Sequence, residues 1–282
     1  MRNPSLPAKL NDITSFIVMD VLEKAQMMES QGIDVIHLEI GEPDFPTPEA
    51  VKDAALRAIR DDDTHYTHSL GKLSLREEIA NYYWRKYKVS ISPEQIMITS
   101  GTSPAMLLIF SVLLEAGKEM IMPDPYYACY PNFVRFTDGR AVLVPVNEED
   151  GFIYRQEEIN KLINPSTCAI LVNSPSNPTG IVYPPEIMQS LADTDQMIVA
   201  DEIYHGLVYA GQEHSMLEYT DRAFVINGFS KLYAMTGWRL GYLIAPKSYM
   251  RTLQILQQNL FICASSFAQE AGIVALRDCD QV

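Results

Sequence analysis

The fold of this protein is best read from AFVINGFSKLYAMTGWRLGYLIA, residues 223–245. Its first four residues, 223–226, form an apolar, β-branched run that predicts a buried strand. The run breaks at Asn227-Gly228 into a polar turn that carries Lys231. Arg239 follows eight residues after the lysine and opens a second apolar run, residues 240–245. The stretch therefore predicts two strands whose ends hold a lysine and an arginine near each other.

These two cations suggest a particular chemistry. A lysine beside the dry edge of a sheet has its ammonium form disfavoured, so its amine becomes a usable nucleophile. An arginine nearby can bind a phosphate through two parallel hydrogen bonds. The pair thus indicates an imine-forming Lys231 beside a phosphate-binding Arg239. For an isolated pair, a solvated loop lysine and a structural arginine are the far more common explanation, by roughly ten to one or more, because short motifs often match by chance.

Composition narrows the function classes. The chain has 282 residues, of which 47% are hydrophobic, enough for one large domain or two modest ones. Its net charge of −14 argues against nucleic acid and anionic membranes as main partners. The N-terminus lacks the apolar core of a signal peptide, and the longest apolar run, residues 105–110, cannot span a membrane. With four dispersed cysteines and no metal-ligand spacing, we expect a cytoplasmic protein without a metal site.

The pattern of apolar runs predicts an α/β fold. Helical patterns separate several of the strand-like runs, so we expect a mainly parallel sheet of seven strands sandwiched by helices. The seven runs are residues 95–99, 120–122, 141–146, 168–173, 197–200, 224–226 and 240–244. Upstream, residues 35–40 alternate like a short strand, and Ser15, Thr47 and Ser74 are placed to cap helices. Ligands in such sheets bind beyond the carboxyl ends of the strands.

Polar residues follow the first two of these strands. Gly101, Thr102 and Ser103 lie where a helix starts, and exposed amides there form an anion site. The alternative is an ordinary helix start. Tyr127 follows residues 120–122, where it can stack on a flat ring or pack in the core. No glycine-rich dinucleotide or nucleoside triphosphate motif is present.

The next two strands also end in polar residues. Asn177 lies between proline-containing turns, and its amide can bond a ligand oxygen or simply stabilise the turn. Asp201 closes an apolar strand, where a carboxylate is costly unless it is paired. A cationic ring nitrogen would pair it, as would a hydrogen bond from a neighbouring turn. Tyr204, three residues on, can donate to a nearby phenolate oxygen.

Three motifs in this order carry a family resemblance. They are SPSNPTG at residues 174–180, ADEIY at residues 200–204 and GFSKLYAMTGWRLGY at residues 228–242. The chain resembles the class I/II aminotransferases, fold type I enzymes that depend on pyridoxal 5'-phosphate, over nearly its whole length. The motifs are specific, and they reverse the odds against the isolated lysine–arginine pair.

The resemblance implies a role for each candidate residue. Lys231 forms the internal aldimine with the cofactor. Asp201 keeps the pyridinium nitrogen protonated, and Asn177 and Tyr204 hydrogen-bond the phenolic oxygen. Tyr127 stacks on the ring. The phosphate is held by Arg239, Ser230 and the amides of Gly101, Thr102 and Ser103.

Other positions concern the substrate and a second subunit. Gly41 lines the substrate carboxylate site, with Asn177 also in contact with the substrate. Tyr66 reaches across a homodimer interface to the partner's phosphate. The serine that the family usually has three residues before the lysine is Gly228 here, which weakens one phosphate contact.

The implied reaction moves an amino group between an α-amino acid and a 2-oxo acid by a ping-pong mechanism. Lys231, released and neutral, removes the Cα proton of the substrate and returns it as a general acid–base. 2-Oxoglutarate is a plausible acceptor. Nothing in the sequence selects the side chain of the donor amino acid.

The C-terminal end departs from the family pattern. The chain stops at Val282, near the end of a helix-like stretch, residues 267–277. The family continues into a segment with the arginine that binds the substrate carboxylate. We therefore expect a fragment with weakened transamination. We expect three parts: residues 1–50 as an arm with part of a small domain, residues 51–255 as the large cofactor-binding domain, and residues 256–282 as an incomplete small-domain segment.

Three other functions share the same motifs. A β-lyase or another fold type I enzyme uses the same cofactor cage, and it would release pyruvate and ammonia instead of a 2-oxo acid and a new amino acid. A cofactor-binding regulator ranks low because no basic DNA-binding segment precedes the domain. An inert truncation product is the remaining alternative.

Overall fold

The computed structural model describes residues 7–279. Strands and helices alternate along most of the chain. The helices are α1 Ala8–Asn11, α2 Ile17–Ser30, α3 Glu49–Arg60, α4 Leu73–Tyr87, α5 Thr102–Leu113, α6 Tyr130–Phe136, α7 Gln156–Leu162, α8 Pro185–Ala192, α9 Lys247–Leu260 and α10 Ser266–Asp278. The strands are β1 Ile96–Thr99, β2 Glu119–Asp124, β3 Arg140–Pro145, β4 Thr167–Asn173, β5 Met197–Asp201, β6 Ala223–Gly228 and β7 Gly241–Ile244. Three 3₁₀ turns complete the set: η1 Pro93–Gln95, η2 Glu148–Asp150 and η3 Met216–Glu218.

The strands form one seven-stranded sheet in the order β1-β7-β6-β5-β4-β2-β3. Strands β2 to β6 pair in parallel, whereas β7 runs antiparallel to both β1 and β6. The predicted mainly parallel seven-stranded sheet is confirmed. The seven apolar runs become strands because a sheet covered on both faces buries every side chain of its central strands.

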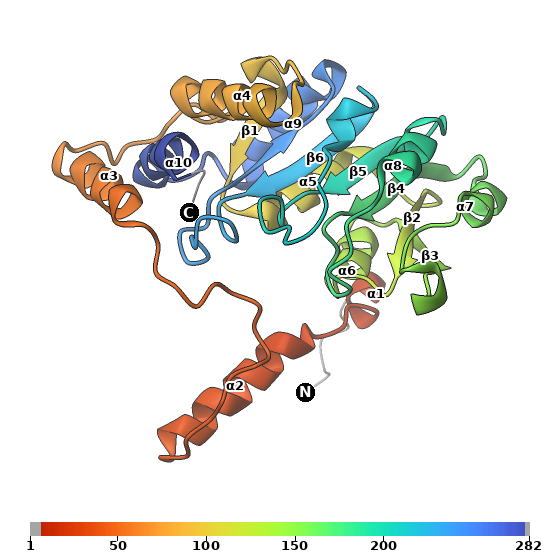
Figure 1. The fold of residues 1–282 in the computed structure, drawn as a ribbon, viewed down its shortest axis with the longest axis horizontal. Helices are drawn as coiled ribbons and strands as arrows, with labels where there is room; N and C mark the ends of the chain where they lie inside the picture. Colours follow the sequence, from red (N-terminus) through yellow and green to blue (C-terminus); the bar gives the residue numbers. More distant parts are fainter. Residues whose placement is uncertain (1–6, 280–282) are drawn as a thin grey trace.

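Alternate residues of each strand contribute to two separate cores. In β1, Ile98 belongs to the core on one face, to which α3, α4, α7, α8 and α10 also contribute. Its neighbour Met97 belongs to the core on the other face, to which α5, α6 and α9 contribute. This alternation follows from the two-residue side-chain period of a strand. The expected layer of helices on each side of the sheet is therefore present (Figure 1).

The strand pairing brings several chain segments to one rim of the sheet. Asn173 at the end of β4 is opposite Asp201 at the end of β5. Gly241 at the start of β7 is opposite both Gly228 of β6 and Thr99 of β1. Because β7 is antiparallel, its first residue meets the last residues of its neighbours. The turns that follow β1, β4, β5 and β6 therefore leave the sheet at the same rim.

The N-terminal segment differs from its prediction. Residues 35–40 form no strand, because no neighbouring strand pairs with them, and their apolar side chains Ile36 and Leu38 are 84% and 91% exposed. Helix α2 begins at Ile17 with Phe16 in the cap position. The Ser15 hydroxyl donates to the Asp20 carboxylate and does not accept from a backbone amide of the helix, as a cap would. Figure 1 shows α2 projecting from the body of the molecule.

Two further predicted caps are wrong. Pro48 occupies the cap position of α3, and the Thr47 hydroxyl donates instead to the carbonyl of Ala234, at 2.6 Å. Lys72 precedes α4, which places Ser74 inside the first turn of the helix and not at its start. Local sequence signals failed here because tertiary partners competed for the hydroxyl of Thr47.

The predicted division into domains stays a prediction. Helix α9 runs across the expected boundary after residue 255, and α10 packs against α3 and α4 in the large body. Residues 1–6 and 280–282, the outer ends of the expected arm and C-terminal segment, lie outside the described residues. Over residues 7–279, the structure has no helix with the length and hydropathy needed to span a bilayer.

Candidate active site

Lys231 lies in the turn that follows β6, at the rim where the strands end. Its side chain is half-buried, and Nζ donates to the carbonyl of Gly41 at 2.5 Å. The ammonium is 5.8 Å from the centre of the Tyr204 ring. Burial lowers the pKa of Lys231, Glu42 opposes this effect and the positive charge of Arg239 adds to it. The amine is therefore easier to deprotonate than an exposed lysine, as nucleophilic or base chemistry requires.

Asp201 ends β5 with its side chain inside the protein. The residue is 3% exposed, and its carboxylate accepts hydrogen bonds from the Tyr130 hydroxyl at 2.7 Å and from the Ile203 amide at 3.2 Å. Burial raises the pKa of Asp201 to about 6, and these two hydrogen bonds only partly offset the effect. A buried carboxylate in this position favours a cationic partner, because an opposite charge restores its ionised form.

The turn after β4 connects to the turn after β5. The Asn177 side-chain amide donates to the Tyr204 hydroxyl at 3.3 Å. The Asn177 backbone amide donates to the side-chain oxygen of Asn173 at 2.6 Å, and the Asn173 amide donates to the carbonyl of Asp201 at 2.9 Å. Asn177, Tyr204 and Asp201 are thus held in one hydrogen-bonded unit, and their separate predicted roles toward the cofactor stay predictions.

Gly101 and Arg239 form a tight corner at the start of α5. Gly101 has φ +94°, and a Cβ there would lie 2.4 Å from Nη2 of Arg239. Helix α5 begins at Thr102, and no side chain caps its first amides. A guanidinium beside the free amides of a helix start makes an anion site, because the amides and the helix dipole both favour negative charge. Thr102 and the exposed Ser103 supply amides of this first turn.

The remaining predicted residues differ in their burial and in their contacts. The ring of Tyr127 is half-buried and lies edge-on to Tyr130 with 5.3 Å between centroids. Ser230 is the half-buried residue before Lys231 in the turn, and Gly41 is at the site through its carbonyl. Tyr66 is 82% exposed. Contacts join Gly41 to Lys231, Lys231 to Tyr204, Tyr204 to Asn177 and Gly101 to Arg239, and the binding roles of all these residues stay predictions.

Sequence reasoning missed two residues of the site. Tyr130 bonds Asp201 directly, and Asn173 links Asp201 to Asn177. Asn173 is the last residue of a predicted strand, so its position at the rim was available as a signal. Tyr130 follows Tyr127 by three residues, the spacing that places two side chains on one face of a helical turn. Neither signal identifies the bonding partner.

Gly228 has a steric reason for being glycine. A Cβ on this residue would lie 3.1 Å from the Cα of Gly241 and 3.1 Å from the carbonyl oxygen of Leu240. Both are backbone atoms of an adjoining strand and its lead-in, so neither moves aside easily. A serine here would crowd the β6–β7 pair unless the two strands separated slightly.

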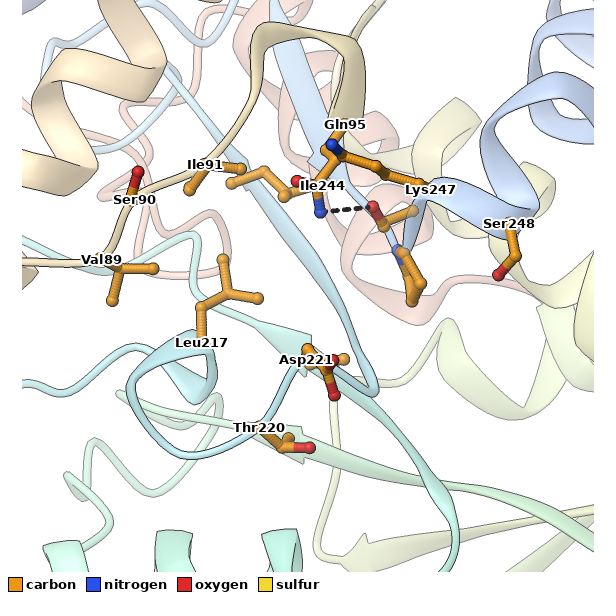
Figure 2. A pocket seen from close by; sticks show the side chains of 13 residues that line it. Val89, Ser90, Ile91, Gln95, Leu217, Thr220, Asp221, Ile244, Lys247 and Ser248 are labelled. Atoms are coloured by element: carbon orange, nitrogen blue, oxygen red, sulfur yellow. Dashed lines mark hydrogen bonds between the residues drawn. The ribbon is translucent and has the colours of Figure 1, made fainter.

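A cavity of about 510 Å³ lies elsewhere, at the other end of the sheet. Its wall includes Gln95, which donates to the carbonyl of Ala245 at 3.4 Å, and Ala223 at the start of β6 (Figure 2). None of the predicted site residues lines it. Its polar rim contains Asp221 and Lys247, but no buried ionisable group faces it, so it does not compete with the Lys231 rim as an active site.

Comparison with known proteins shows the family to which this chain belongs. Residues 33–282 match the family model described as aminotransferase class I and II. This chain belongs to the class I and II aminotransferase family. It is 42% identical over 273 residues to a (5-formylfuran-3-yl)methyl phosphate transaminase of Methanocaldococcus jannaschii, covering 96% of this chain and 72% of that protein.

Solved aminotransferases share the fold as well as the sequence. An aspartate aminotransferase from Thermus thermophilus with maleate superposes with a TM-score of 0.94 at 36% identity, over 98% of this aminotransferase and 74% of the other. The aspartate aminotransferase of Bacillus subtilis is 36% identical, covering 96% of this chain and 71% of that protein. The predicted family and fold type are confirmed.

The residues present fit the cofactor of this family, pyridoxal 5'-phosphate. The corner at Gly101 admits no side chain and joins the helix amides to a guanidinium, which suits a phosphate. Asp201 offers a buried carboxylate whose hydrogen-bond partners, the Tyr130 hydroxyl and the Ile203 amide, are both neutral, which suits a protonated ring nitrogen. Lys231 has a lowered pKa, to which the charge of Arg239 contributes, and its ammonium is 5.8 Å from the centre of the Tyr204 ring. The donor set therefore matches the aldehyde, pyridine and phosphate of one small molecule.

Proposed function

We propose that this aminotransferase uses pyridoxal 5'-phosphate to move an amino group between an α-amino acid and a 2-oxo acid in two half-reactions. The observation that carries this proposal is the meeting of Lys231, Asp201 and Arg239 at one rim of the sheet. Each has the charge and burial that one part of the cofactor needs. When bound, the cofactor's ring supplies an electron sink for a substrate carbanion.

Lys231 acts as the proton carrier of the reaction. Its lowered pKa keeps a fraction of the amine neutral, so Nζ can take the proton that leaves the substrate's Cα and donate it back. The carbonyl of Gly41 and the face of Tyr204 hold Nζ at this position. Gly41 and Tyr204 belong to two separate segments of the chain, so together they orient the amine of Lys231.

The other residues bind and orient. Asp201 would pair with the ring nitrogen and hold a proton there, while Tyr130 keeps its carboxylate in place. Asn177 and Tyr204 would donate to the phenolic oxygen, with Asn177 also facing the substrate. Tyr127 would cover one face of the ring. Arg239, Ser230 and the first amides of α5 would hold the phosphate.

Product analysis tests this function. Purified chain loaded with the cofactor is given a panel of amino acids, including aspartate, alanine and phenylalanine, with 2-oxoglutarate as acceptor. We expect one 2-oxo acid and one glutamate for each donor consumed. Double-reciprocal plots of initial rate against donor concentration, taken at several acceptor concentrations, should give parallel lines, as in ping-pong kinetics. Release of pyruvate and ammonia without glutamate would instead identify a β-lyase, and no turnover with any donor would indicate an inactive chain.

We propose in addition that the functional unit is a cytoplasmic homodimer, with Tyr66 contributing to the partner's phosphate site. The 82% exposure of this aromatic side chain leaves it available to a second subunit, which supports the dimer. Four free cysteines, none in a disulfide, fit a reducing compartment.

Sedimentation of the cofactor-loaded protein tests the dimer. We expect a species of twice the 31.8 kDa of one chain. Tyr66→Phe should weaken cofactor binding by about tenfold, since it removes one hydrogen bond to a charged group. Tyr209→Phe, a change at a residue that is 99% exposed, is the matched control and should have no effect. A fully loaded monomer would rule out this role for Tyr66.

A further inference from the structure

The residue after Asp201 points to the opposite face of the sheet and is equally buried. Glu202 is 1% exposed. One carboxyl oxygen, Oε1, accepts from the Ser215 hydroxyl at 2.9 Å and from the Met216 amide at 2.9 Å. The other, Oε2, is hydrogen-bonded to the Tyr83 hydroxyl at 3.2 Å. Glu202 therefore joins the turn after β5 to helix α4 and to the 3₁₀ turn η3.

No cation among residues 7–279 pairs closely with this carboxyl group. The ammonium of Lys86, whose charge acts on His205, pairs instead with Glu213 at 2.6 Å and donates to the Tyr82 hydroxyl at 3.1 Å. His205 approaches to 3.7 Å through Nδ1, but this atom is bonded to the Tyr87 hydroxyl at 2.6 Å. An ionised carboxylate so deep in the protein would thus lack the opposite charge that normally offsets its burial.

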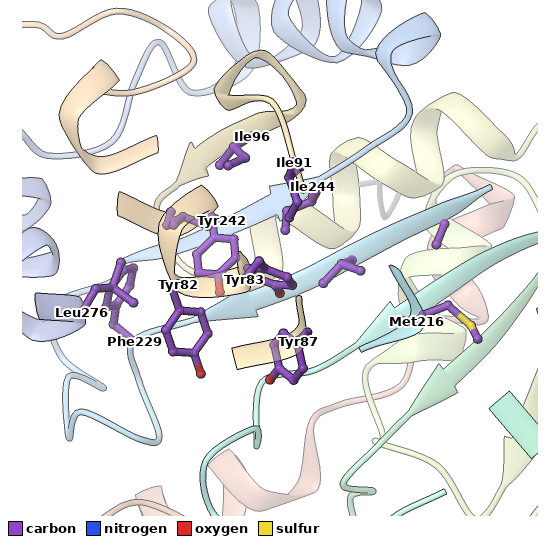
Figure 3. Close-up of a cluster of buried hydrophobic side chains, with 14 of the residues drawn as sticks. Tyr82, Tyr83, Tyr87, Ile91, Ile96, Met216, Phe229, Tyr242, Ile244 and Leu276 are labelled. Carbon is purple, nitrogen blue, oxygen red and sulfur yellow. The ribbon is translucent and has the colours of Figure 1, made fainter. Parts of the chain in front are cut away.

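The histidine is also uncharged. Burial lowers the pKa of His205 to about 3, so it does not form an ion pair with Glu202 at neutral pH. Nδ1 of His205 is hydrogen-bonded to the Tyr87 hydroxyl, and either atom donates, depending on the tautomer of the neutral ring. Nε2 has no hydrogen-bond partner of ordinary geometry, although the carbonyl of Ser174 is close enough to raise the pKa slightly. Helix α4 and strand β7 bring further phenols to this place, including those of Tyr82 and Tyr242 (Figure 3).

The bonding pattern identifies where a proton resides on Glu202. Oε1 already accepts two donors, which is the pattern of a carbonyl-type oxygen. Oε2 is hydrogen-bonded to one group, the Tyr83 phenol, whose oxygen can accept a hydrogen bond from an acid hydroxyl, and Nδ1 of His205 lies 3.7 Å away. A protonated carboxyl group satisfies both oxygens, whereas an ionised one leaves Oε2 with a single neutral donor.

We propose that Glu202 is a neutral carboxylic acid at physiological pH and acts as a positioning residue for the catalytic turn. Its backbone amide donates to the carbonyl of Ile226 in β6, and its carbonyl accepts from the amide of His205. The side chain therefore fixes the segment that carries Asp201 on one side and Tyr204 on the other. Ionisation of Glu202 would leave the Tyr83 hydroxyl as the donor to Oε2 and would place a charge inside the protein without a paired cation. Water or a counterion would have to enter to offset this charge, and that change would move the segment.

Stability gives a readout that does not need the cofactor. Burial raises the pKa of Glu202 from the ordinary 4.5 to about 8, so the folded chain retains a proton that the unfolded chain releases between these values. The stabilisation is complete below about pH 4.5 and is lost as pH rises to about 8. Other ionisable side chains face this cluster, so the experiment needs a variant in which they are unchanged. They are Tyr82, Tyr83, Tyr87, Tyr242, Lys86, His205, Glu213, His214 and Glu218.

The experiment compares the wild type with Glu202→Gln, Glu202→Ala and Glu115→Gln. The amide of glutamine has the shape and hydrogen-bonding pattern of the neutral acid, with an acceptor toward Ser215 and a donor toward Tyr83. Glu115 is exposed, so its replacement controls for the loss of one carboxylate. Because the neighbouring groups are unchanged in Glu202→Gln, the difference in melting temperature isolates Glu202.

We expect the melting temperature of the wild type to fall relative to Glu202→Gln between about pH 5 and pH 8, and Glu115→Gln to follow the wild type. At pH 7, Glu202→Gln should keep cofactor affinity and turnover within about threefold, whereas Glu202→Ala, which leaves buried donors unpaired, should lose about tenfold or more. A pH dependence that is identical in the wild type and Glu202→Gln would overturn the neutral acid.

The positioning role rests on the proposed aminotransferase function and is tested separately from it. Equal loss of activity in Glu202→Gln and Glu202→Ala, with the wild-type protein active, would overturn positioning by the neutral acid. If the wild type has no transaminase activity, the function proposed above fails, but the melting curves and the cofactor affinities still decide the state and role of Glu202.

Discussion

Replacing Lys231 by alanine is expected to abolish the visible absorbance of the bound cofactor and to reduce turnover by at least about four orders of magnitude. General acid–base catalysis alone is worth roughly 10²–10⁴-fold, and Lys231 also serves as the nucleophile. The half-buried amine is the only proton carrier that we place next to the carbonyl of Gly41 and the ring of Tyr204. Absorbance spectra and single-turnover kinetics measure the two losses.

Two controls sharpen this prediction. Lys231→Arg keeps the positive charge but cannot provide a neutral amine, since a guanidinium stays protonated at any accessible pH. It should therefore be as inactive as the alanine variant. Lys161→Ala removes an exposed lysine that pairs with Glu158 and should leave spectrum and turnover unchanged. An arginine variant with substantial activity would show that charge, and not proton transfer, is what position 231 supplies.

Replacing Asp201 by asparagine is expected to reduce turnover by roughly 10²–10³-fold while cofactor still binds, as for the loss of one preorganised electrostatic group. The amide preserves the size of the side chain and an oxygen that can accept from Tyr130, but it removes the negative charge. Without that charge the ring nitrogen is no longer held protonated, so the substrate carbanion is less stabilised. Steady-state kinetics and cofactor titration measure the two effects independently.

Tyr130→Phe separates the charge of Asp201 from its orientation. This variant keeps the carboxylate but removes the 2.7 Å hydrogen bond, and we expect a smaller loss, about tenfold. Asp195→Asn changes a carboxylate whose side chain is 98% exposed and serves as the unaffected control. Near-normal turnover of Asp201→Asn would contradict the assigned role, whatever the result for Tyr130.

The central fold could be predicted because its signals are local and redundant. Every predicted strand of the sheet is observed, with ends that differ by a few residues, because a run of buried apolar residues has few alternatives to a central strand. The segment at residues 35–40 shows the limit of this reasoning. Its alternating pattern resembles a strand, but a strand forms only where another strand pairs with it, and pairing is not a local property.

The sequence indicates candidate residues for the site but not the contacts between them. One stretch contains both Lys231 and Arg239, whereas their distance from Asp201 and Asn177 depends on the order of the strands in the sheet. Tyr130 is an example of a contact that the sequence does not indicate. Its hydroxyl donates to Asp201 from a helix 71 positions earlier in the chain, and no sequence spacing encodes that bond.

By itself, the sequence determined which residue types are available at the strand ends and that the strands are buried, because composition and two-residue periodicity are properties of short segments. Only the tertiary structure decided which of these ends meet. The antiparallel insertion of β7 brings Gly241 against Gly101, and the parallel pairing of β4 and β5 puts Asn173 beside Asp201. Packing also places Asp201 toward Tyr130 and Glu202 toward Tyr83, on opposite faces of the sheet. The burial and the hydrogen-bond partners at each place set the pKa of each carboxyl group.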